Sequence, residues 1–193
     1  MWMFIGVMVL VVLMVVGPVM MIRPTPRQRR VTQLRGAALP AGMTVRMGRL
    51  KESVGSQNSY SIAIYCLPVP EVMKKAIKDT PRFNWRLLRR SMSHELHLAH
   101  YWDWEDRANA PSEINNKLLE WLTTLPKSVR AVEMTCYGPG FYWTEQALGI
   151  GLGDGSSDRD GNESVTSEIK YLHDKLTELL NIVVATNRSV EIL

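Results

Sequence analysis

Hydrophobic positions divide the chain into one continuous apolar block and a longer region in which apolar and polar residues alternate. Residues 1–22 contain no charged side chain, whereas the next eight residues hold four arginines and no acid. At about 1.5 Å per residue, a helix of this length would be about as long as a bilayer's hydrocarbon core is thick. A cleaved signal peptide would need basic residues before the apolar block and small residues after it, and neither is present. The pattern therefore predicts a retained transmembrane helix over residues 1–22.

The alternating region has the periods of strands and helices. Apolar residues recur every second position in several runs, and every third or fourth position in others. Strands are predicted over 43–50, 60–67, 83–90 and 95–105, a β-hairpin with its turn at 138–140, and helices over 71–79, 111–125 and 163–184. This order predicts an α+β domain with helices on one face of a mostly antiparallel sheet. The predicted organisation is a transmembrane helix (1–22), a basic juxtamembrane helix or linker (23–42) and a cytoplasmic α+β domain (43–193).

Charge is distributed unevenly along the chain. Eight of the 23 lysines and arginines fall within residues 23–51, which contain no acid. Cations beside a spanning helix resist translocation, so the N-terminus is expected outside and the domain in the cytoplasm of a bacterial inner membrane. The lipid bilayer is then a partner, and anionic headgroups would contact the basic residues nearest the span. These residues are Arg23, Arg27, Arg29, Arg30 and Arg35. Nucleic-acid binding is the alternative use of such a segment.

Residues able to carry chemistry do not form a recognised catalytic or metal-binding motif. His94, His97 and His100 would converge on a helix, but on the predicted strand His97 points away from the other two. No catalytic residue, metal ligand or cofactor is therefore predicted, and an enzyme or metal protein using these histidines remains an alternative. Aromatic residues near strand ends are candidates for a protein interface, where tryptophan and tyrosine are favoured. They are Trp102, Trp104, Tyr142 and Trp143.

The N-terminal quarter resembles a known family. The apolar block followed by MIRPTPRQRRVTQLRGAALPAGMTV is similar to the start of YajC, the accessory subunit of the bacterial preprotein translocase. The likeness ends near Arg49, because the glycine-rich β-segment of YajC does not follow. The rest of the chain is similar to uncharacterised bacterial single-pass membrane proteins that often carry a YajC-like label. The segments that carry this similarity are FNWRLLRR, WDWE, LTTLPKSVRAVEM and GFYWTEQA. The resemblance implies no catalytic residues.

These observations lead to one functional hypothesis and two alternatives. The expected protein is a single-pass inner-membrane protein whose cytoplasmic domain binds another protein, as a non-catalytic accessory or assembly subunit of a membrane complex. The alternatives are a YajC-like accessory of the preprotein translocase and an enzyme that uses the region of His94, His97 and His100.

Overall fold

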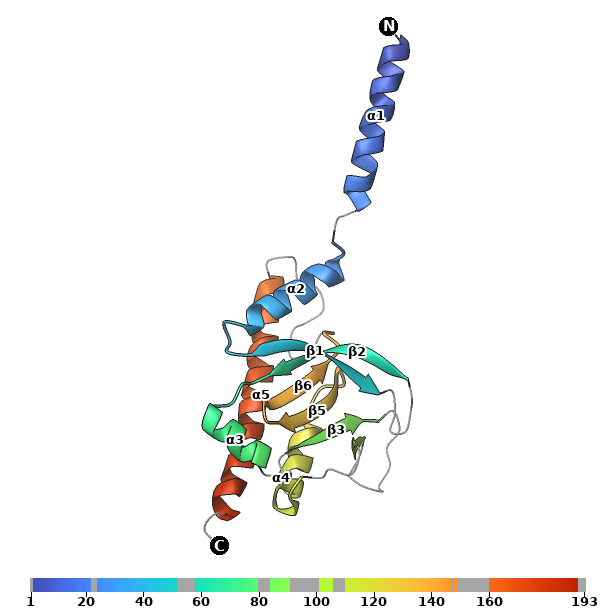
Figure 1. The fold of residues 1–193 in the computed structure, drawn as a ribbon. Coiled ribbons are helices and arrows are strands. Elements are labelled where there is room, and N and C mark those ends of the chain that lie inside the picture. Colours follow the sequence, from blue (N-terminus) through green and yellow to red (C-terminus); the bar gives the residue numbers. More distant parts are fainter. Residues whose placement is uncertain are drawn as a thin grey trace.

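A computed structural model describes residues 2–21, 24–51, 58–79, 84–90, 101–105, 110–146, 148 and 160–190. The first helix, α1 (Trp2–Met21), projects away from a body of helices and strands (Figure 1). The helices of the body are α2 (Pro26–Ala38), α3 (Glu71–Asp79), α4 (Ser112–Thr123) and α5 (Asp160–Val190). Its strands are β1 (Thr44–Lys51), β2 (Ser59–Cys66), β3 (Trp85–Arg89), β4 (Trp102–Trp104), β5 (Val129–Thr135) and β6 (Gly138–Trp143).

The six strands form one sheet in the order β1-β2-β6-β5-β3-β4, and every neighbouring pair is antiparallel. β1 and β2 pair along their whole length, from Thr44 opposite Cys66 to Lys51 opposite Ser59. β1 and β4 lie at the two ends of the sheet. The described residues therefore have an α+β fold.

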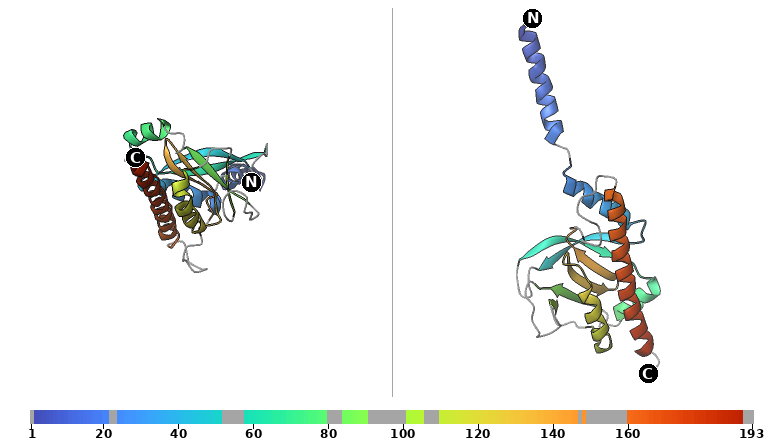
Figure 2. Two further views of the ribbon diagram at one scale, coloured as in Figure 1. Left: turned by 90° about the horizontal axis from the view of Figure 1, so that it is seen from below. Right: turned by 180° about the vertical axis from the view of Figure 1, so that it is seen from behind.

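One face of the sheet packs against helices. Strand side chains alternate between the two faces, so Tyr65, Val132 and Phe141 join a core that also contains buried residues of α2, α4 and α5. Two opposite views show α4 and α5 on the same side of the sheet (Figures 1 and 2). The other face carries a smaller apolar cluster that includes Ile64 and Tyr142, together with several charged side chains. The two faces therefore differ in chemistry.

α2 belongs to the body rather than forming a separate linker. A capping box starts the helix, because the Thr25 hydroxyl accepts from the Gln28 backbone while the Gln28 side chain accepts from the Thr25 backbone. Leu34 and Ala38 lie four residues apart on one stripe, and both are fully buried in the core. The basic helix predicted within residues 23–42 is thus present and packed onto the domain.

The hairpin is shifted from its predicted position. The turn consists of residues 136–137, and residues 138–140 lie inside β6. Gly138 has φ of 113°, and a Cβ there would lie 2.1 Å from the backbone oxygen of Leu67. The Pro139 carbonyl accepts a hydrogen bond from the Leu67 backbone at 3.0 Å. Glycine is therefore favoured at residue 138 both by the positive φ that follows the turn and by the close approach of the Leu67 backbone.

The predicted transmembrane helix is not supported. In the part of the chain that the structure describes, no helix is both long enough and apolar enough to cross a bilayer. This finding contradicts the single-pass membrane class and the inner-membrane location with an outside N-terminus. The predicted contacts with the bilayer and its headgroups stay a prediction that no finding tests.

Candidate functional site

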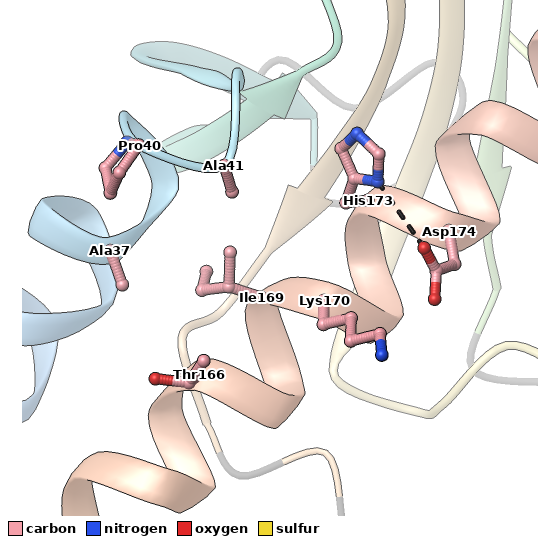
Figure 3. Close-up of a pocket in the computed structure, with 8 residues that line it drawn as sticks. All are labelled: Ala37, Pro40, Ala41, Thr166, Ile169, Lys170, His173 and Asp174. Carbon is pink, nitrogen blue, oxygen red and sulfur yellow. Dashed lines mark hydrogen bonds and ion pairs between the residues drawn. The ribbon is translucent and has the colours of Figure 1, made fainter.

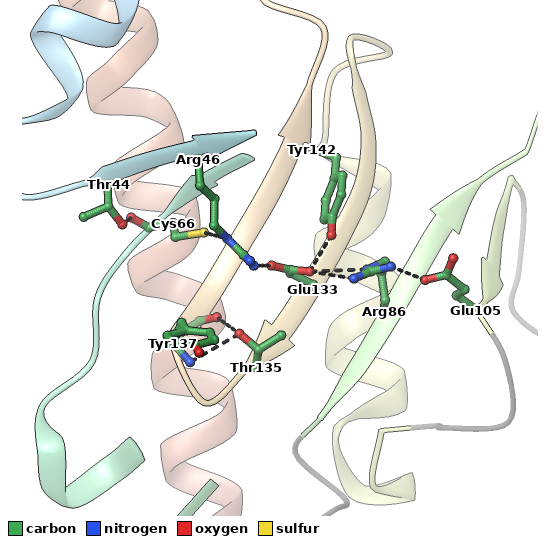
Figure 4. Close-up of polar contacts among 10 residues, drawn as sticks. Thr44, Arg46, Cys66, Arg86, Glu105, Glu133, Thr135, Tyr137 and Tyr142 are labelled. Atoms are coloured by element: carbon green, nitrogen blue, oxygen red, sulfur yellow. Dashed lines mark hydrogen bonds and ion pairs between the residues drawn. The ribbon is translucent and has the colours of Figure 1, made fainter. Parts of the chain in front are cut away.

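A buried carboxylate lies at the centre of the charged side of the sheet. Glu133 of β5 has no exposed surface. Its Oε2 accepts from the Tyr142 hydroxyl at 2.7 Å and from Arg86 Nε at 3.3 Å (Figure 4). Its Oε1 accepts from Arg46. Both carboxylate oxygens are therefore occupied by donors from three other strands.

The contacts continue across the sheet as a row. Arg86 also donates to Glu105, the residue that follows β4, and Arg46 Nε contacts Cys66 Sγ of β2 at 3.5 Å (Figure 4). The Arg86 guanidinium carbon lies 5.0 Å from the centre of the Tyr142 ring, within the range of a cation–π contact. Two arginines and two glutamates balance each other's charge. We call these four side chains, with Cys66 and Tyr142, the charged row.

The two weakly acidic groups of the charged row are held in their neutral forms. Burial raises the pKa of the Cys66 thiol, although Arg46 beside it acts in the opposite direction. Burial, followed by the neighbouring Glu133 carboxylate, raises the pKa of Tyr142. A cysteine is nucleophilic as its thiolate, so Cys66 is not activated here. The side chains of the charged row therefore link neighbouring strands, and none of them is activated as a nucleophile.

A second ionic contact fixes α2 to the segment that follows β6. Arg35 donates to both carboxylate oxygens of Glu145, at 2.7 and 2.9 Å. The Tyr65 hydroxyl donates to the same carboxylate at 3.0 Å. The hydrogen bond with Glu145 raises the pKa of Arg35 against the opposing effect of burial. Glu145 has φ of 58°, a conformation that non-glycine residues seldom adopt, so the local structure holds this carboxylate in place.

A third contact joins α2 to α5. Arg30 donates to both oxygens of Glu168, at 2.7 and 2.8 Å, and the Leu148 backbone amide donates to the same carboxylate at 3.3 Å. Glu168 is 5% exposed, so its carboxylate is largely shielded from water, whereas the Arg30 side chain is partly exposed. Of the residues predicted to contact headgroups, Arg30 and Arg35 instead bind acids of the body. Arg27 and Arg29 are exposed on α2, and Arg23 lies outside the described residues.

A shallow pocket of about 470 Å³ lies between α2 and α5 (Figure 3). Ala37 and Ile169 supply its apolar part, whereas Lys170, His173 and Asp174 supply charged groups on α5. His173 Nδ1 lies 3.5 Å from Asp174 Oδ1. The remaining lining residues are Pro40, Ala41 and Thr166. Its size and composition suit an apolar side chain of another molecule better than a charged ligand.

α1 has the largest concentration of exposed apolar side chains. Among the residues whose side chains the structure describes, sixteen large hydrophobic residues are strongly exposed, and eleven of them lie on α1, from Trp2 at 89% to Val11 at 51%. Trp2 and Phe4 are among them, as are Met3, Met8 and Met14. No described residue of the body covers this surface.

The aromatic residues predicted as an interface are buried in the chain's own core. Trp102, Trp104, Tyr142 and Trp143 are all less than 10% exposed. The Trp143 ring packs edge-on against Tyr65 with 5.2 Å between ring centres, and Trp104 packs in the same way against Trp85 at 5.6 Å. Their contacts are thus accounted for within the chain, so these four residues do not form an exposed patch.

The predicted histidine run cannot be placed in this site. His94, His97 and His100 lie outside the described residues. Within the described residues, no group of three histidine, cysteine or acidic side chains is arranged to hold a metal ion. Cys66 is buried and Cys136 is partly exposed, and both are free thiols.

Sequence reasoning missed the three glutamates that organise the ionic contacts. Glu133 lies within the apolar run VRAVEMT, and an acid in such a run was a usable sign of a buried charge with partners. Glu145 and Glu168 had no comparable local sign.

Comparisons with known proteins identify no relative. No family model, curated protein or solved structure matches the chain. The resemblance to YajC is therefore neither supported nor contradicted.

Proposed function

We propose that this protein is a non-catalytic interaction subunit that associates with another protein through α1. The observation that carries the proposal is the apolar surface of α1, on which eleven large side chains are at least 51% exposed. Exposed apolar surface on this scale is unusual for a monomer and is typical of an interaction site. A helix that is apolar on all sides is normally buried by its surroundings.

The composition of α1 also favours a protein partner. Tryptophan, phenylalanine and methionine are enriched at the centres of protein interfaces, and charged residues are depleted there. α1 presents Trp2, Phe4 and three methionines, and it carries no charged residue. The flexible methionine side chains adapt to an irregular apolar surface. We therefore expect α1 to insert into an apolar groove of its partner.

The body supports an accessory role because the buried polar groups of the charged row are occupied in structural contacts. Both oxygens of Glu133 accept hydrogen bonds, and burial raises the pKa values of Cys66 and Tyr142. A catalytic base needs an available lone pair, and a nucleophile needs a lowered pKa or an adjacent base. The charged row lacks these features among the residues described.

The proposal can be tested with two leucines of matched exposure. Leu10 on α1 is 66% exposed, and Leu39 at the end of α2 is 68% exposed. Full-length protein would be extracted from its native cells in a mild nonionic detergent, and the mass of the particle would be measured for each variant. We expect a stoichiometric complex for the wild type and for Leu39→Asp. Leu10→Asp should lose at least tenfold in association, because it buries an unpaired charge in the interface.

Two results would contradict the proposal. In one, Leu10→Asp and Leu39→Asp retain the complex equally. In the other, the purified wild type has the mass of a single chain yet floats with phospholipid vesicles to which no other protein has been added.

A further inference from the structure

β1 has one edge that pairs with no other strand in the described part of the chain. It lies at the end of the sheet, and all eight of its residues pair with β2 on the other side. The backbone N–H and C=O groups along an outer edge can pair with an added strand. Extended peptides are recognised in this way when their side chains also match the edge.

The side chains of β1 give this edge a definite charge. β1 contains Arg46, Arg49 and Lys51 and no acid. Arg46 is engaged by Glu133 in the charged row. Arg49 and Lys51 are exposed, and no ion pair involves either of them within the described residues. They are two positions apart, so they lie on the same face of the sheet.

An apolar position accompanies these cations. Met47 is two residues before Arg49, on the same face, and is 56% exposed. An extended segment lying along β1 would therefore meet one apolar and two cationic side chains at alternate positions.

We propose that the outer edge of β1 binds an extended acidic segment of a partner protein as an added strand. Its carboxylates lie opposite Arg49 and Lys51, and an apolar side chain lies opposite Met47. Oppositely charged side chains on facing strands stabilise their pairing. This site uses a surface other than α1, so it stands independently of the interaction proposed above.

Charged side chains on an edge strand can also prevent the strand from pairing with other chains. Arg49 and Lys51 could therefore serve either to bind a segment or to keep segments away. The two uses make different predictions. A protective edge binds no peptide, whereas a recognition edge binds an acidic peptide and requires its backbone hydrogen bonds.

The test uses the full chain in mild nonionic detergent and a fluorescent octapeptide that alternates glutamate and valine. We expect saturable binding to the wild type and about a tenfold or greater loss for the double variant Arg49→Glu/Lys51→Glu. The matched control is Arg27→Glu/Arg29→Glu, which makes the same charge change at exposed positions of α2. This control should bind within twofold of the wild type, about the spread expected of distant sites. Equal melting temperatures would establish that all variants are folded.

N-methylated peptides separate strand addition from simple charge attraction. Methylation of alternate amides along the edge that faces β1 should abolish binding, whereas methylation along the opposite edge should leave it intact. The proposal is overturned if both methylated peptides bind like the parent, if the α2 control loses as much affinity as the β1 variant, or if the wild type binds no peptide. It is also overturned if a single-stranded RNA of equal charge displaces the peptide and binds more tightly.

Discussion

α1 and the basic segment that follows it, residues 24–51, differ in how their side chains are accommodated within the chain. α1 is apolar throughout, yet its large side chains remain exposed in the described structure. The basic segment is rich in arginine, yet Arg30, Arg35 and Arg46 each bind a carboxylate that is at most 11% exposed. The apolar region thus lacks a partner within the chain, whereas the charged region has several.

The difference shows that a helix packs on the body when its apolar and charged side chains match those of the body. High hydrophobicity alone is not enough. α2 contributes only Leu34 and Ala38 as fully buried residues, but its arginines meet acids placed at matching positions. α1 has more apolar surface but meets no matching surface on the body. Three of the eight cations in residues 23–51 thus form ion pairs with acids of the body.

Removing the central acid of the charged row should have the largest effect. Glu133→Ala would leave Arg46 and Arg86 without their shared carboxylate. Both arginine side chains are partly exposed, so the expected cost of about 3 kcal/mol is at the low end for breaking a buried ion pair. Urea unfolding followed by tryptophan fluorescence measures this loss. Glu71→Ala is the control, because its ion pair with Lys74 is on the surface and should change stability by less than about 0.5 kcal/mol. Similar losses for the two variants would show that the charged row is not structural.

A pair of leucines compares the two helices directly. Leu34 of α2 is fully buried, whereas Leu10 of α1 is 66% exposed. Leu34→Ala should lower the free energy of unfolding by about 2–5 kcal/mol through lost burial and a new cavity. Leu10→Ala should change it by less than about 0.5 kcal/mol. Equal effects in urea unfolding would mean that α1 packs against the body in solution.

The sequence predicted local structure better than long-range contacts. Predicted strands at 43–50 and 60–67 correspond to β1 and β2, and the predicted helix at 71–79 coincides with α3. Hydrophobic period is a property of neighbouring residues, so it can be recognised in one sequence. The turn of the hairpin was misplaced because Gly138 was predicted as a turn residue. It instead lies against the backbone of Leu67, which is distant in the sequence.

The candidate site was much less predictable. Arg30 and Glu168 are 138 positions apart, and Arg35 and Glu145 are 110 apart. Charge counts showed a basic segment and an acidic remainder, but not that they bind each other. Similarly, alternation placed Trp102 and Trp104 on one face of a strand without showing that helices cover that face. The pattern alone therefore left open whether these aromatic residues belong to the core or to an interface.

Alkaline pH should loosen the contacts of the body but not affect α1. Burial, followed by Glu145, raises the pKa of Tyr65 above its ordinary value. The unfolded chain therefore loses this proton first, and stability that is complete below about pH 10 declines above it, by up to about 1.4 kcal/mol per pH unit for each such group. Tyr142 acts in the same direction, and Cys66 does so from a lower pH.

The variant Tyr65→Phe tests this dependence. It should reduce the slope of unfolding free energy against pH between about pH 10 and 12. Leu10→Ala should leave the slope unchanged, because α1 has no titratable side chain. An unchanged slope in Tyr65→Phe would contradict the raised pKa.

Breaking the Arg35 contact should have a smaller effect. The Arg35 side chain is 40% exposed, so solvent screens part of its interaction with Glu145. Arg35→Met should cost about 1 kcal/mol of unfolding free energy, since it removes two charge-assisted hydrogen bonds but retains the aliphatic stem. Arg29→Met, at an exposed position of α2, is the matched control and should change stability by less than about 0.5 kcal/mol. Equal losses would show that the pair with Glu145 does not hold α2 in place.

Site-specific photo-crosslinking in intact cells shows whether α1 contacts a protein partner. A photoreactive phenylalanine analogue would replace Phe4 on α1 in one variant and exposed Tyr137 on the body in another. We expect the probe on α1 to form one dominant adduct with a protein of defined mass, and we expect the probe on the body not to form this adduct. Adducts of the α1 probe with lipid alone, or the same protein adduct from both positions, would contradict this expectation.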